Sequence, residues 1–315
     1  MIADFLQPAL IISLLGGMIR IVVPILYASL GELIVERSGI LNLSVEGGLT
    51  IGAFAGFAIA HQYHSLWFGV LCAGLAGSAL ALIMAFLTIT LKQDQTIAGL
   101  ALNLFAGGLS FYIYRVLYKD FLGGNMPTVT PFHEVAIPGL VNIPIIGPAF
   151  FSQHILAYIA FLMVPLIFYF LYRTKYGLAL RCLGENPRTV DMKGLNVAGI
   201  QYAALLFGGF MYGVGGCCLT LTSAGMFVDG IAAGRGWIAI AIVIFGGWRP
   251  WSILGASLFF AFLESLQNQV QSIGFTLIPY QFVAMLPYIV TILVLLLSRK
   301  RSGAPLALGI PYTRE

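Results

Sequence analysis

Seven stretches of about 20 apolar residues constrain this chain more than any other feature of its sequence. An α-helix needs about 20 predominantly apolar residues to cross the hydrocarbon core of a bilayer. Only 9% of the 315 residues are charged and the mean hydropathy is +0.95, whereas a soluble domain carries about 25% charged residues. We therefore predict an all-α, polytopic membrane helix bundle in a single transmembrane domain over residues 1–315. The predicted spans lie near residues 8–31, 66–91, 95–117, 153–172, 197–222, 251–270 and 280–298.

Two further segments, 38–60 and 225–248, are apolar but are interrupted by glycines and polar residues. Counting both as crossings gives about nine transmembrane segments. Backbone groups that leave a helix inside lipid cost several kcal/mol each unless protein or water satisfies them. A break at membrane depth is therefore expected where it lines a cavity, and a pair of breaks in corresponding places is the pattern of a transporter's substrate site.

The order of these segments repeats. The chain before residue 119 reads as span, broken segment, span, span, and the chain after residue 196 reads the same way. Because the two sets begin on opposite sides of the membrane, we predict an inverted repeat with broken helices. Coincidental spacing is the alternative. GxxxG spacing at Gly52/Gly56 and Gly209/Gly213 favours close helix packing, although chance pairs also occur in a chain with 37 glycines.

The distribution of Lys and Arg predicts the orientation. With nine spans, 12 of the 16 basic residues fall on the side that holds the C-terminus. We therefore expect the C-terminus in the cytoplasm and the N-terminus outside. The loop at 119–152 would then be external, as a cap against an external partner or as a plain connector. It holds five of the fourteen prolines.

The segment SGILNLSVEGG at 38–48 places Asn42, Ser44 and Glu46 two residues apart in an apolar setting. We predict that this segment is unwound and that these alternate side chains face an aqueous pocket. Ionisable groups within a membrane are candidate functional groups, which singles out Glu46. The alternative for Glu46 is an interfacial carboxylate near Arg37.

Glu264 is a second candidate within a predicted span, and Asn268 is a candidate on the same helix. Residues three and four apart share a helix face, so the alternative for Glu264 is a structural hydrogen bond to Gln267 or Asn268.

The stretch YGLALRCLGENPRTVDMKGLNV at 176–197 is the sizeable hydrophilic loop on the predicted inner side. Glu185, Asn186 and Pro187 indicate a helix start. A short helix parallel to the membrane would suit docking into a groove on a partner. The alternative is a solvated connector.

Motifs of soluble catalysis are missing from the sequence. It contains no GxxxxGK[ST], HExxH or GxSxG motif, so the chain is not expected to be an enzyme or to hydrolyse ATP by itself. The cysteine spacings predict no metal site, and we expect no cofactor and no nucleic-acid partner. A competing function is a secondary transporter that uses Glu46 and Glu264 as proton-coupled carboxylates. An intramembrane enzyme fits less well.

Three motifs carry a family resemblance. GILNLSVEG (39–47) resembles the G-I-x-L-S-V-G signature of sugar-type permeases in the ABC importer superfamily, the branched-chain amino acid/ribose type. LGENPRTVDMKGLNV (183–197) resembles that family's coupling loop, G-x-N-x-x-A-A-x-x-x-G-I-x-V, with Thr189, Val190 and Leu195 as departures. GELIVERSGILNLSVEG and the tail APLALGIPYTRE more closely resemble permeases of nucleoside ABC importers.

This resemblance implies a permease subunit of an ATP-driven importer for nucleosides, with simple sugars as the alternative substrate. It also implies that this subunit lies in the bacterial cytoplasmic (inner) membrane and has three partner subunits: a tandem ABC ATPase that binds the ATP, a second related permease in a heterodimer, and a substrate-binding lipoprotein. GRGWIAIAIVIFGGW (234–248) matches the second broken element, where Trp237 would stack on a base or serve only in packing. The implied substrate pathway comprises Asn42, Ser44, Glu46, Trp237, Glu264 and Asn268. The implied ATPase coupling residues are Gly184, Glu185, Asn186, Pro187 and Arg188.

Overall fold

A computed structural model describes residues 8–119, 126–144, 146–272, 285, 289 and 303–313. The predicted span at 280–298 lies outside the described residues, apart from two positions. The helices are α2 (Pro8–Arg37), α3 (Val45–Tyr63), α4 (Leu66–Ala85), α5 (Gln95–Leu117), α6 (Ile146–Phe150), α7 (Ile155–Arg173), α8 (Lys175–Glu185), α9 (Pro187–Met192), α10 (Val197–Cys218), α11 (Arg235–Phe245) and α12 (Pro250–Ser272). Two π-helical turns, η1 (Phe86–Thr90) and η3 (Leu219–Ala224), extend α4 and α10.

Five of these helical segments are long and apolar enough to cross a membrane: Leu10–Arg37, Leu66–Thr90, Gln95–Leu117, Ile155–Arg173 and Val197–Ala224. The chain is thus a polytopic membrane helix bundle, as predicted. By contrast, α11 has 11 residues and extends only about 17 Å at 1.5 Å per residue. It is too short to cross the roughly 30 Å hydrocarbon core alone.

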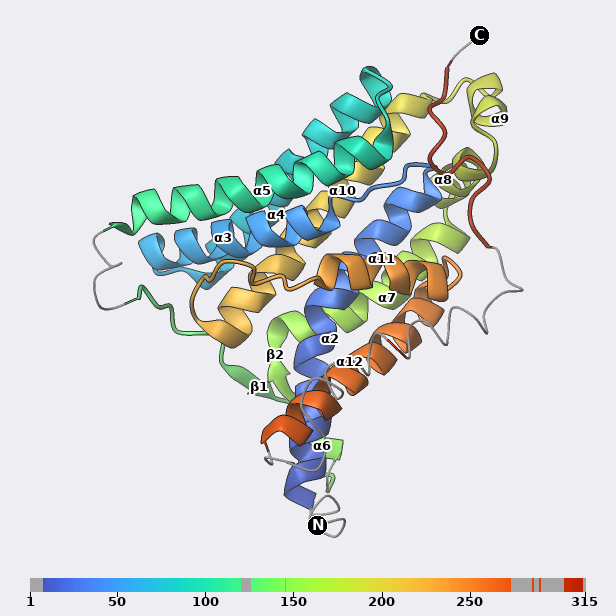
Figure 1. Cartoon of the computed structure of the whole chain (residues 1–315). Coiled ribbons are helices and arrows are strands. Elements are labelled where there is room, and N and C mark those ends of the chain that lie inside the picture. The colour runs from blue at the N-terminus through green and yellow to red at the C-terminus, as the bar shows by residue number, and fades with distance from the viewer. Residues whose placement is uncertain are drawn as a thin grey trace.

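Both predicted breaks contain a non-helical segment, but the first is shorter than the predicted 38–48, because residues 45–48 belong to the first turn of α3 and Glu46 therefore lies on a helix. Residues 38–44 separate α2 from α3, and residues 225–234 separate η3 from α11. After α2 ends, the chain returns toward the middle of the bundle, and α3 starts there and runs away from α8 and α9 (Figure 1). After η3 the chain returns in the same way, but α11 runs from the middle toward the end that carries α8 and α9.

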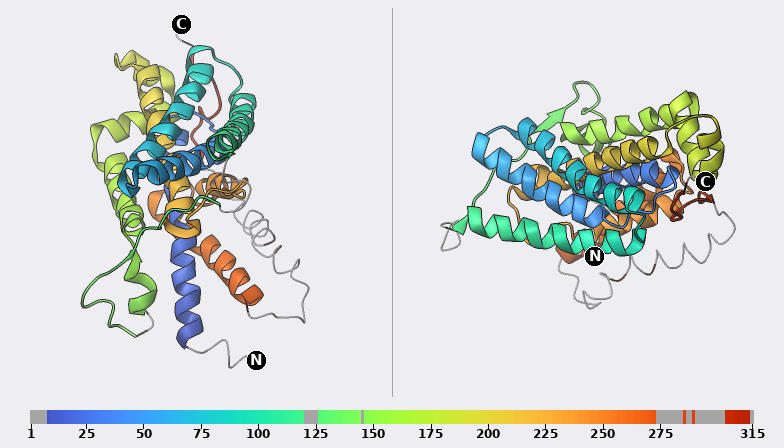
Figure 2. Two further views of the ribbon diagram at one scale, coloured as in Figure 1. Left: turned by 90° about the vertical axis from the view of Figure 1, so that its left-hand side faces the viewer. Right: turned by 90° about the horizontal axis from the view of Figure 1, so that it is seen from above.

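The core forms around α2 and α10. Helix α10 packs against α2, α3 and α4, while α2 also packs against α11 and α12. Figure 2 shows α2 and α12 extending beyond α3, α4 and α5. The predicted glycine contact is confirmed, because a Cβ added to Gly52 would lie 2.4 Å from the Gly213 Cα. Larger side chains there would separate α3 from α10.

The loop at 119–152 corrects the all-α prediction. Its described part contains strand β1 (Glu134–Ala136), which pairs antiparallel with β2 (Ser152–His154). Proline lacks a backbone N–H and disrupts helix interiors, so this proline-rich segment satisfies backbone groups by strand pairing instead. Burial and the nearby Arg20 lower the pKa of His154 to about 4, so this buried side chain is neutral at pH 7.

Candidate functional site: the junction of two half-helices

The N-termini of α3 and α11 meet in the middle of the bundle and run in opposite directions (Figure 1). We refer to residues 42–47 and 234–236 as the half-helix junction. Gly236 permits the contact, since a Cβ there would lie 2.4 Å from the Glu46 backbone nitrogen and 2.5 Å from its Cα. No other residue type could occupy this position without moving one of the two helices.

The Glu46 carboxylate joins the two helix ends. Its Oε1 accepts a hydrogen bond from the Gly234 N–H at 2.8 Å, and its Oε2 accepts one from the Gly236 N–H at 2.7 Å. The first amides of a helix lack partners within the helix, and the dipole gives that end partial positive charge. Glu46 therefore satisfies two donors of α11 while lying in the first turn of α3, where its charge is also favourable.

The N-terminus of α3 is held by a neutral amide instead. Asn103 of α5 accepts a hydrogen bond from the Gly47 N–H at 2.7 Å, and its side-chain amide donates one to the Leu43 carbonyl at 2.5 Å. Gln95, at the start of α5, accepts from the Leu41 N–H at 2.7 Å. Sequence reasoning missed both side chains. For Asn103 the available signal was an amide within an apolar turn, whereas Gln95 stands in the polar stretch KQDQT at 92–96 and gave no such signal.

Asn42 and Ser44 are buried and bonded to each other, and they do not face an open cavity. The Asn42 Oδ1 accepts from the Ser44 N–H at 3.0 Å and from the Ser44 hydroxyl at 2.6 Å. The Asn42 amide donates to the Tyr212 hydroxyl of α10 at 3.4 Å. The two side chains therefore fix the shape of the first break and anchor it to α10.

Two buried carboxylates of α2 extend this polar network. Glu32 accepts a hydrogen bond from the Tyr212 hydroxyl, and Glu36 accepts one from the Trp248 indole. Both are almost fully buried, with exposed fractions of 0% and 1%. Arg37 donates to the Trp248 carbonyl at 2.8 Å and not to Glu46. The sequence did not single out Glu32 and Glu36, because the predicted first span ended at residue 31, whereas α2 continues to Arg37.

Glu264 forms an ion pair with Arg235, with a distance of 2.7 Å between Oε1 and the guanidinium. This bond links α12 to the first residue of α11, and the partner of Glu264 is therefore Arg235 and not Gln267 or Asn268, which were considered as the structural alternative. Trp237 is 43% exposed and Asn268 is also exposed. Thus Trp237 and Glu264 lie at or beside α11, whereas Asn268 lies one turn further along α12. Among the described residues, no three His, Cys, Asp or Glu side chains could hold a metal ion together.

Residues 10–296 match the protein family described as branched-chain amino acid transport system / permease component. The chain belongs to this family of transport permeases. It is a transport subunit with no ATPase domain of its own. No solved structure matches it.

Three curated relatives cover nearly the whole permease. The guanosine ABC transporter permease protein NupQ of Bacillus subtilis is 36% identical over 92% of this chain and 93% of its own length. The nucleoside ABC transporter permease protein NupC of Lactococcus lactis is 35% identical over 93% and 94%. The putative glucose ABC transporter permease protein TsgC13 of Haloferax volcanii is 35% identical over 96% and 98%.

The hydrophilic loop of the permease folds into α8 and α9, and the predicted helix start is confirmed. The Asn186 side chain accepts a hydrogen bond from the Arg188 N–H at 3.1 Å, and Pro187 takes the first position of α9, where proline fits well. Glu185, Asn186 and Arg188 are exposed. Gly184 is buried, and a Cβ there would lie 2.5 Å from the Arg37 carbonyl, so it packs against the end of α2.

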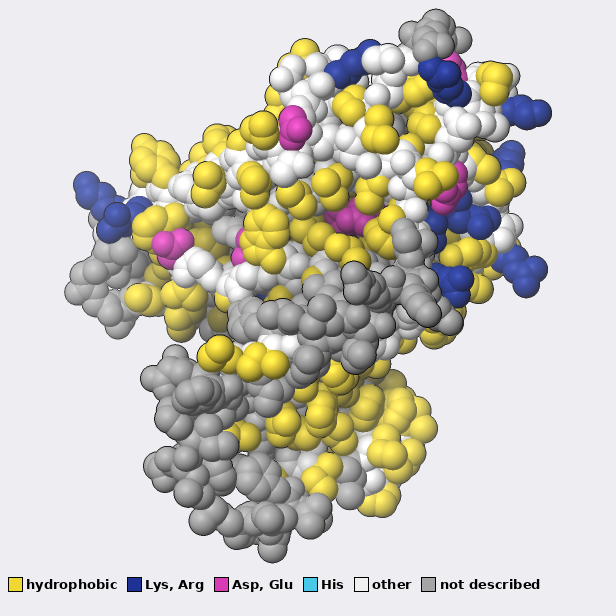
Figure 3. All heavy atoms as spheres, turned by 45° about the vertical axis from the view of Figure 1, so that its right-hand side comes forward, with side chains coloured by type: hydrophobic (Ala, Val, Ile, Leu, Met, Phe, Trp, Pro, Cys, Tyr) yellow, Lys and Arg dark blue, Asp and Glu magenta, His cyan; other side chains and the backbone are white. Residues whose placement is uncertain are grey.

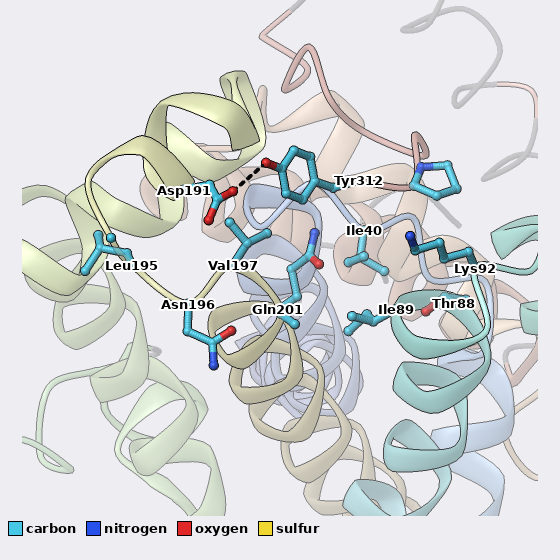
Figure 4. Close-up of a pocket in the computed structure, with 13 residues that line it drawn as sticks. Ile40, Thr88, Ile89, Lys92, Asp191, Leu195, Asn196, Val197, Gln201 and Tyr312 are labelled. Carbon is cyan, nitrogen blue, oxygen red and sulfur yellow. Dashed lines mark hydrogen bonds between the residues drawn. The ribbon is translucent and has the colours of Figure 1, made fainter. Parts of the chain in front are cut away.

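A cavity of about 530 Å³ opens beside α9. It lies between the end of η1, the start of α10 and the C-terminal residues (Figure 4). In Figure 4 the Asp191 carboxylate and the Tyr312 hydroxyl point toward each other at one side, and their oxygens are 2.9 Å apart. Lys92 and Gln201 line other parts of the wall.

Basic side chains gather at the end of the permease that carries α8 and α9, and a smaller group lies at the opposite end (Figure 3). Exposed members on or beside α8 and α9 are Arg173, Lys175, Arg188 and Lys193. An excess of Lys and Arg marks the cytoplasmic side of membrane proteins.

Proposed function

We propose that this permease forms the translocation path of an ATP-driven importer for nucleosides, and that the half-helix junction is the point at which the path opens and closes. The observation that carries this proposal is the Glu46 carboxylate, which bonds the α11 amides from the first turn of α3. Discontinuous helices whose N-termini meet near the bilayer midplane are a recurring substrate site in transporters.

The directions of the helices support a mechanism with two related halves. Helices α2, α3 and α4 run opposite to α10, α11 and α12 (Figure 1). These opposite directions support the predicted inverted repeat, in which about nine crossings would include the span predicted from the sequence at 280–298. Rocking of one half against the other would break and remake the Glu46 contacts and so expose the junction to each side in turn.

Nucleosides are the favoured substrate because two of the three relatives carry nucleoside or guanosine in their names, at 35% and 36% identity. Trp237 adds a chemical reason. It is 43% exposed and directly follows Gly236 of the junction. An exposed indole ring at this place could stack on a base that enters the path. The glucose relative, at 35% identity, makes simple sugars the second candidate.

The orientation follows from the basic residues. We place α8 and α9 in the cytoplasm, in a bacterial cytoplasmic membrane, with the N-terminus outside. The exposed turn at 185–188 would then seat in the groove of a tandem ABC ATPase. The β1–β2 loop would meet the substrate-binding lipoprotein outside. The exposed apolar face of α5, with Leu104 at 81%, offers a surface for the second permease of a heterodimer.

Uptake into proteoliposomes tests the substrate and the energy source. The reconstituted complex with its ATPase should accumulate guanosine when ATP is supplied on the ATPase side, and a proton gradient alone should have no effect. Uptake of glucose without guanosine would favour the sugar permease. Gradient-driven uptake by the isolated chain would favour the proton-coupled transporter.

Charge reversal tests the ATPase contact. Glu185→Lys and Arg188→Glu should weaken co-purification of the ATPase and reduce uptake, because each replaces an attraction at a desolvated contact with a repulsion. Lys119→Glu, just after the end of α5 that lies far from α8 and α9 (Figure 1), is the matched control. If the loop is only a solvated connector, both reversals should behave like the control, since exposed charges contribute less than about 1 kcal/mol.

A further inference from the structure

The C-terminal residues 303–313 lie across the end of the permease that carries α8 and α9 (Figure 1). We call them the C-terminal strap. Two backbone bonds fix the strap: the Ala307 N–H donates to the Gly184 carbonyl at 2.8 Å, and the Gly309 N–H donates to the Gly39 carbonyl at 3.1 Å. The strap therefore connects the end of α8 to the start of the first break.

Side chains strengthen the connection to α9. The Tyr312 hydroxyl lies 2.9 Å from the Asp191 carboxylate of α9, to which it donates a hydrogen bond. The Tyr312 ring packs against a buried cluster of Leu183, Val190 and Val197. Leu183 belongs to α8, Val190 to α9 and Val197 to the start of α10. The strap therefore contacts all three helices of the predicted coupling loop.

The strap is also braced internally. The Leu308 N–H donates to the Pro305 carbonyl at 3.2 Å, and the Ile310 N–H donates to the Ala307 carbonyl at 3.2 Å. Successive turns of this kind keep residues 305–310 compact. A compact strap of this kind could pass a displacement of α8 and α9 on to Gly39.

Only a few residues separate the strap's contact at Gly39 from the half-helix junction. Gly39 adopts a positive φ of +87°, and a Cβ there would lie 3.6 Å from the Gly184 Cα. Three positions later comes Asn42, which shapes the break, and seven positions later comes Glu46. Residues 40–44 lie outside regular secondary structure, so their position depends on contacts with other elements, of which the strap at Gly39 and Asn103 at Leu43 are two.

We propose that the C-terminal strap is a positioning element for transport, which transmits the movement of α9 to the first break and so to the half-helix junction. Tyr312 is the positioning residue that bonds α9, and the Gly309 amide is the group that bonds the first break, at the Gly39 carbonyl. The proposal rests on the proposed function in one respect, since it takes the turn at 185–188 as the ATPase contact.

Hydrogen exchange in the permease–ATPase complex tests the strap without requiring a substrate. In the wild type, ATP should change the exchange of the peptide that covers residues 38–48. Tyr312→Phe removes only the hydroxyl that bonds Asp191, and it should reduce that ATP-dependent change at least about tenfold while the ATPase still co-purifies and still hydrolyses ATP. Tyr169→Phe, an exposed tyrosine on α7, is the matched control and should match the wild type.

Two results would overturn the proposed role of the strap. One is an ATP-dependent change in hydrogen exchange in Tyr312→Phe that equals the wild-type change. The other is no ATP-dependent change in the wild-type peptide. In parallel, guanosine uptake per ATP hydrolysed should fall about tenfold in Tyr312→Phe. If the wild type takes up no guanosine, the proposed substrate is wrong, but the exchange measurement still tests whether the strap transmits the movement of α9.

Discussion

The two breaks of the bundle solve the same backbone problem with different chemistry. In the first break, neutral side chains supply the partners: Asn42 bonds Ser44, and Asn103 bonds the Gly47 amide. In the second break, glycines with positive φ make the turns, at Gly225, Gly230 and Gly234. The start of α11 then takes its hydrogen-bond acceptors from the first half of the chain, through Glu46.

This difference shows where the junction is free to change. The first break is tied to α10 and α5 by its own amides, so it can keep its shape when α11 moves. The Gly234 and Gly236 amides of the second half depend on one carboxylate of the first half, that of Glu46, whereas Glu264 of the second half bonds the Arg235 side chain. A motion that separates α3 from α11 therefore breaks two charged hydrogen bonds and leaves the neutral ones in place.

Gly236→Ala should have the largest effect, because it blocks the contact on which the comparison depends. The added Cβ would lie 2.4 Å and 2.5 Å from the backbone of Glu46, and backbone atoms cannot rotate away as a side chain can. We expect a loss of about 3 kcal/mol or more, seen as a lower unfolding temperature in detergent and loss of uptake. Gly255→Ala in α12 is the control, since nothing lies within 4 Å of the added Cβ. Equal stability of both variants would contradict the close contact.

Glu46→Leu should have the second largest effect, with an expected loss of about 2–4 kcal/mol in the free energy of unfolding. It leaves the Gly234 and Gly236 amides without acceptors, and an unpaired buried donor costs about 1–3 kcal/mol. Glu46→Gln keeps one carbonyl oxygen as an acceptor, so its stability and uptake should lie between those of Glu46→Leu and the wild type. Thermal unfolding and uptake are the measurements. If Glu46→Leu folds and transports like the wild type, the carboxylate is not the link between the halves.

Asn103→Asp tests whether the neutral partner of α3 matters. The carboxylate can still accept from the Gly47 amide, but it cannot donate to the Leu43 carbonyl and it adds a negative charge near Glu46. We expect a loss of about 1–2 kcal/mol of stability and reduced uptake. Gly107→Ala on the same helix is the control, since nothing lies within 4 Å of the added Cβ. An unaffected Asn103→Asp protein would mean that the junction accepts charge on both sides.

The sequence predicted the breaks well because their cause is local. Glycines and polar residues inside an apolar run mark a place where a helix fails, and this is visible without knowing the neighbours. The start of α9 was predictable for the same reason, since Asn186 and Pro187 form a helix start by themselves. The GxxxG spacing at Gly52/Gly56 and Gly209/Gly213 indicated close helix packing, although it did not indicate that Gly52 would meet Gly213.

The partners of the junction could not be predicted, because they lie far apart in the chain. Glu46 bonds amides 188 and 190 positions away, and Asn103 meets the break from another helix. For Glu264, reasoning within one helix suggested Gln267 or Asn268, whereas the observed partner is Arg235 on α11. The two strands were missed because each has only three residues, too few to show an alternating pattern.

The ion pair between Arg235 and Glu264 should have the smallest effect, and it separates a structural role from a proton-coupled one. The two side chains are 20% and 24% exposed, so the pair is partly accessible. Glu264→Gln alone leaves the Arg235 charge without its partner, and we expect a cost of about 1–2 kcal/mol. Replacing both residues with Gln should restore stability to within about 1 kcal/mol of the wild type, because a neutral pair needs no compensating charge. The double-mutant cycle, measured by thermal unfolding, gives the coupling between the two groups. ATP-driven uptake should then survive in the double variant. If uptake is lost there at normal stability, Glu264 acts on the path directly, and the asymmetry between the two halves would no longer rest on Glu46 alone.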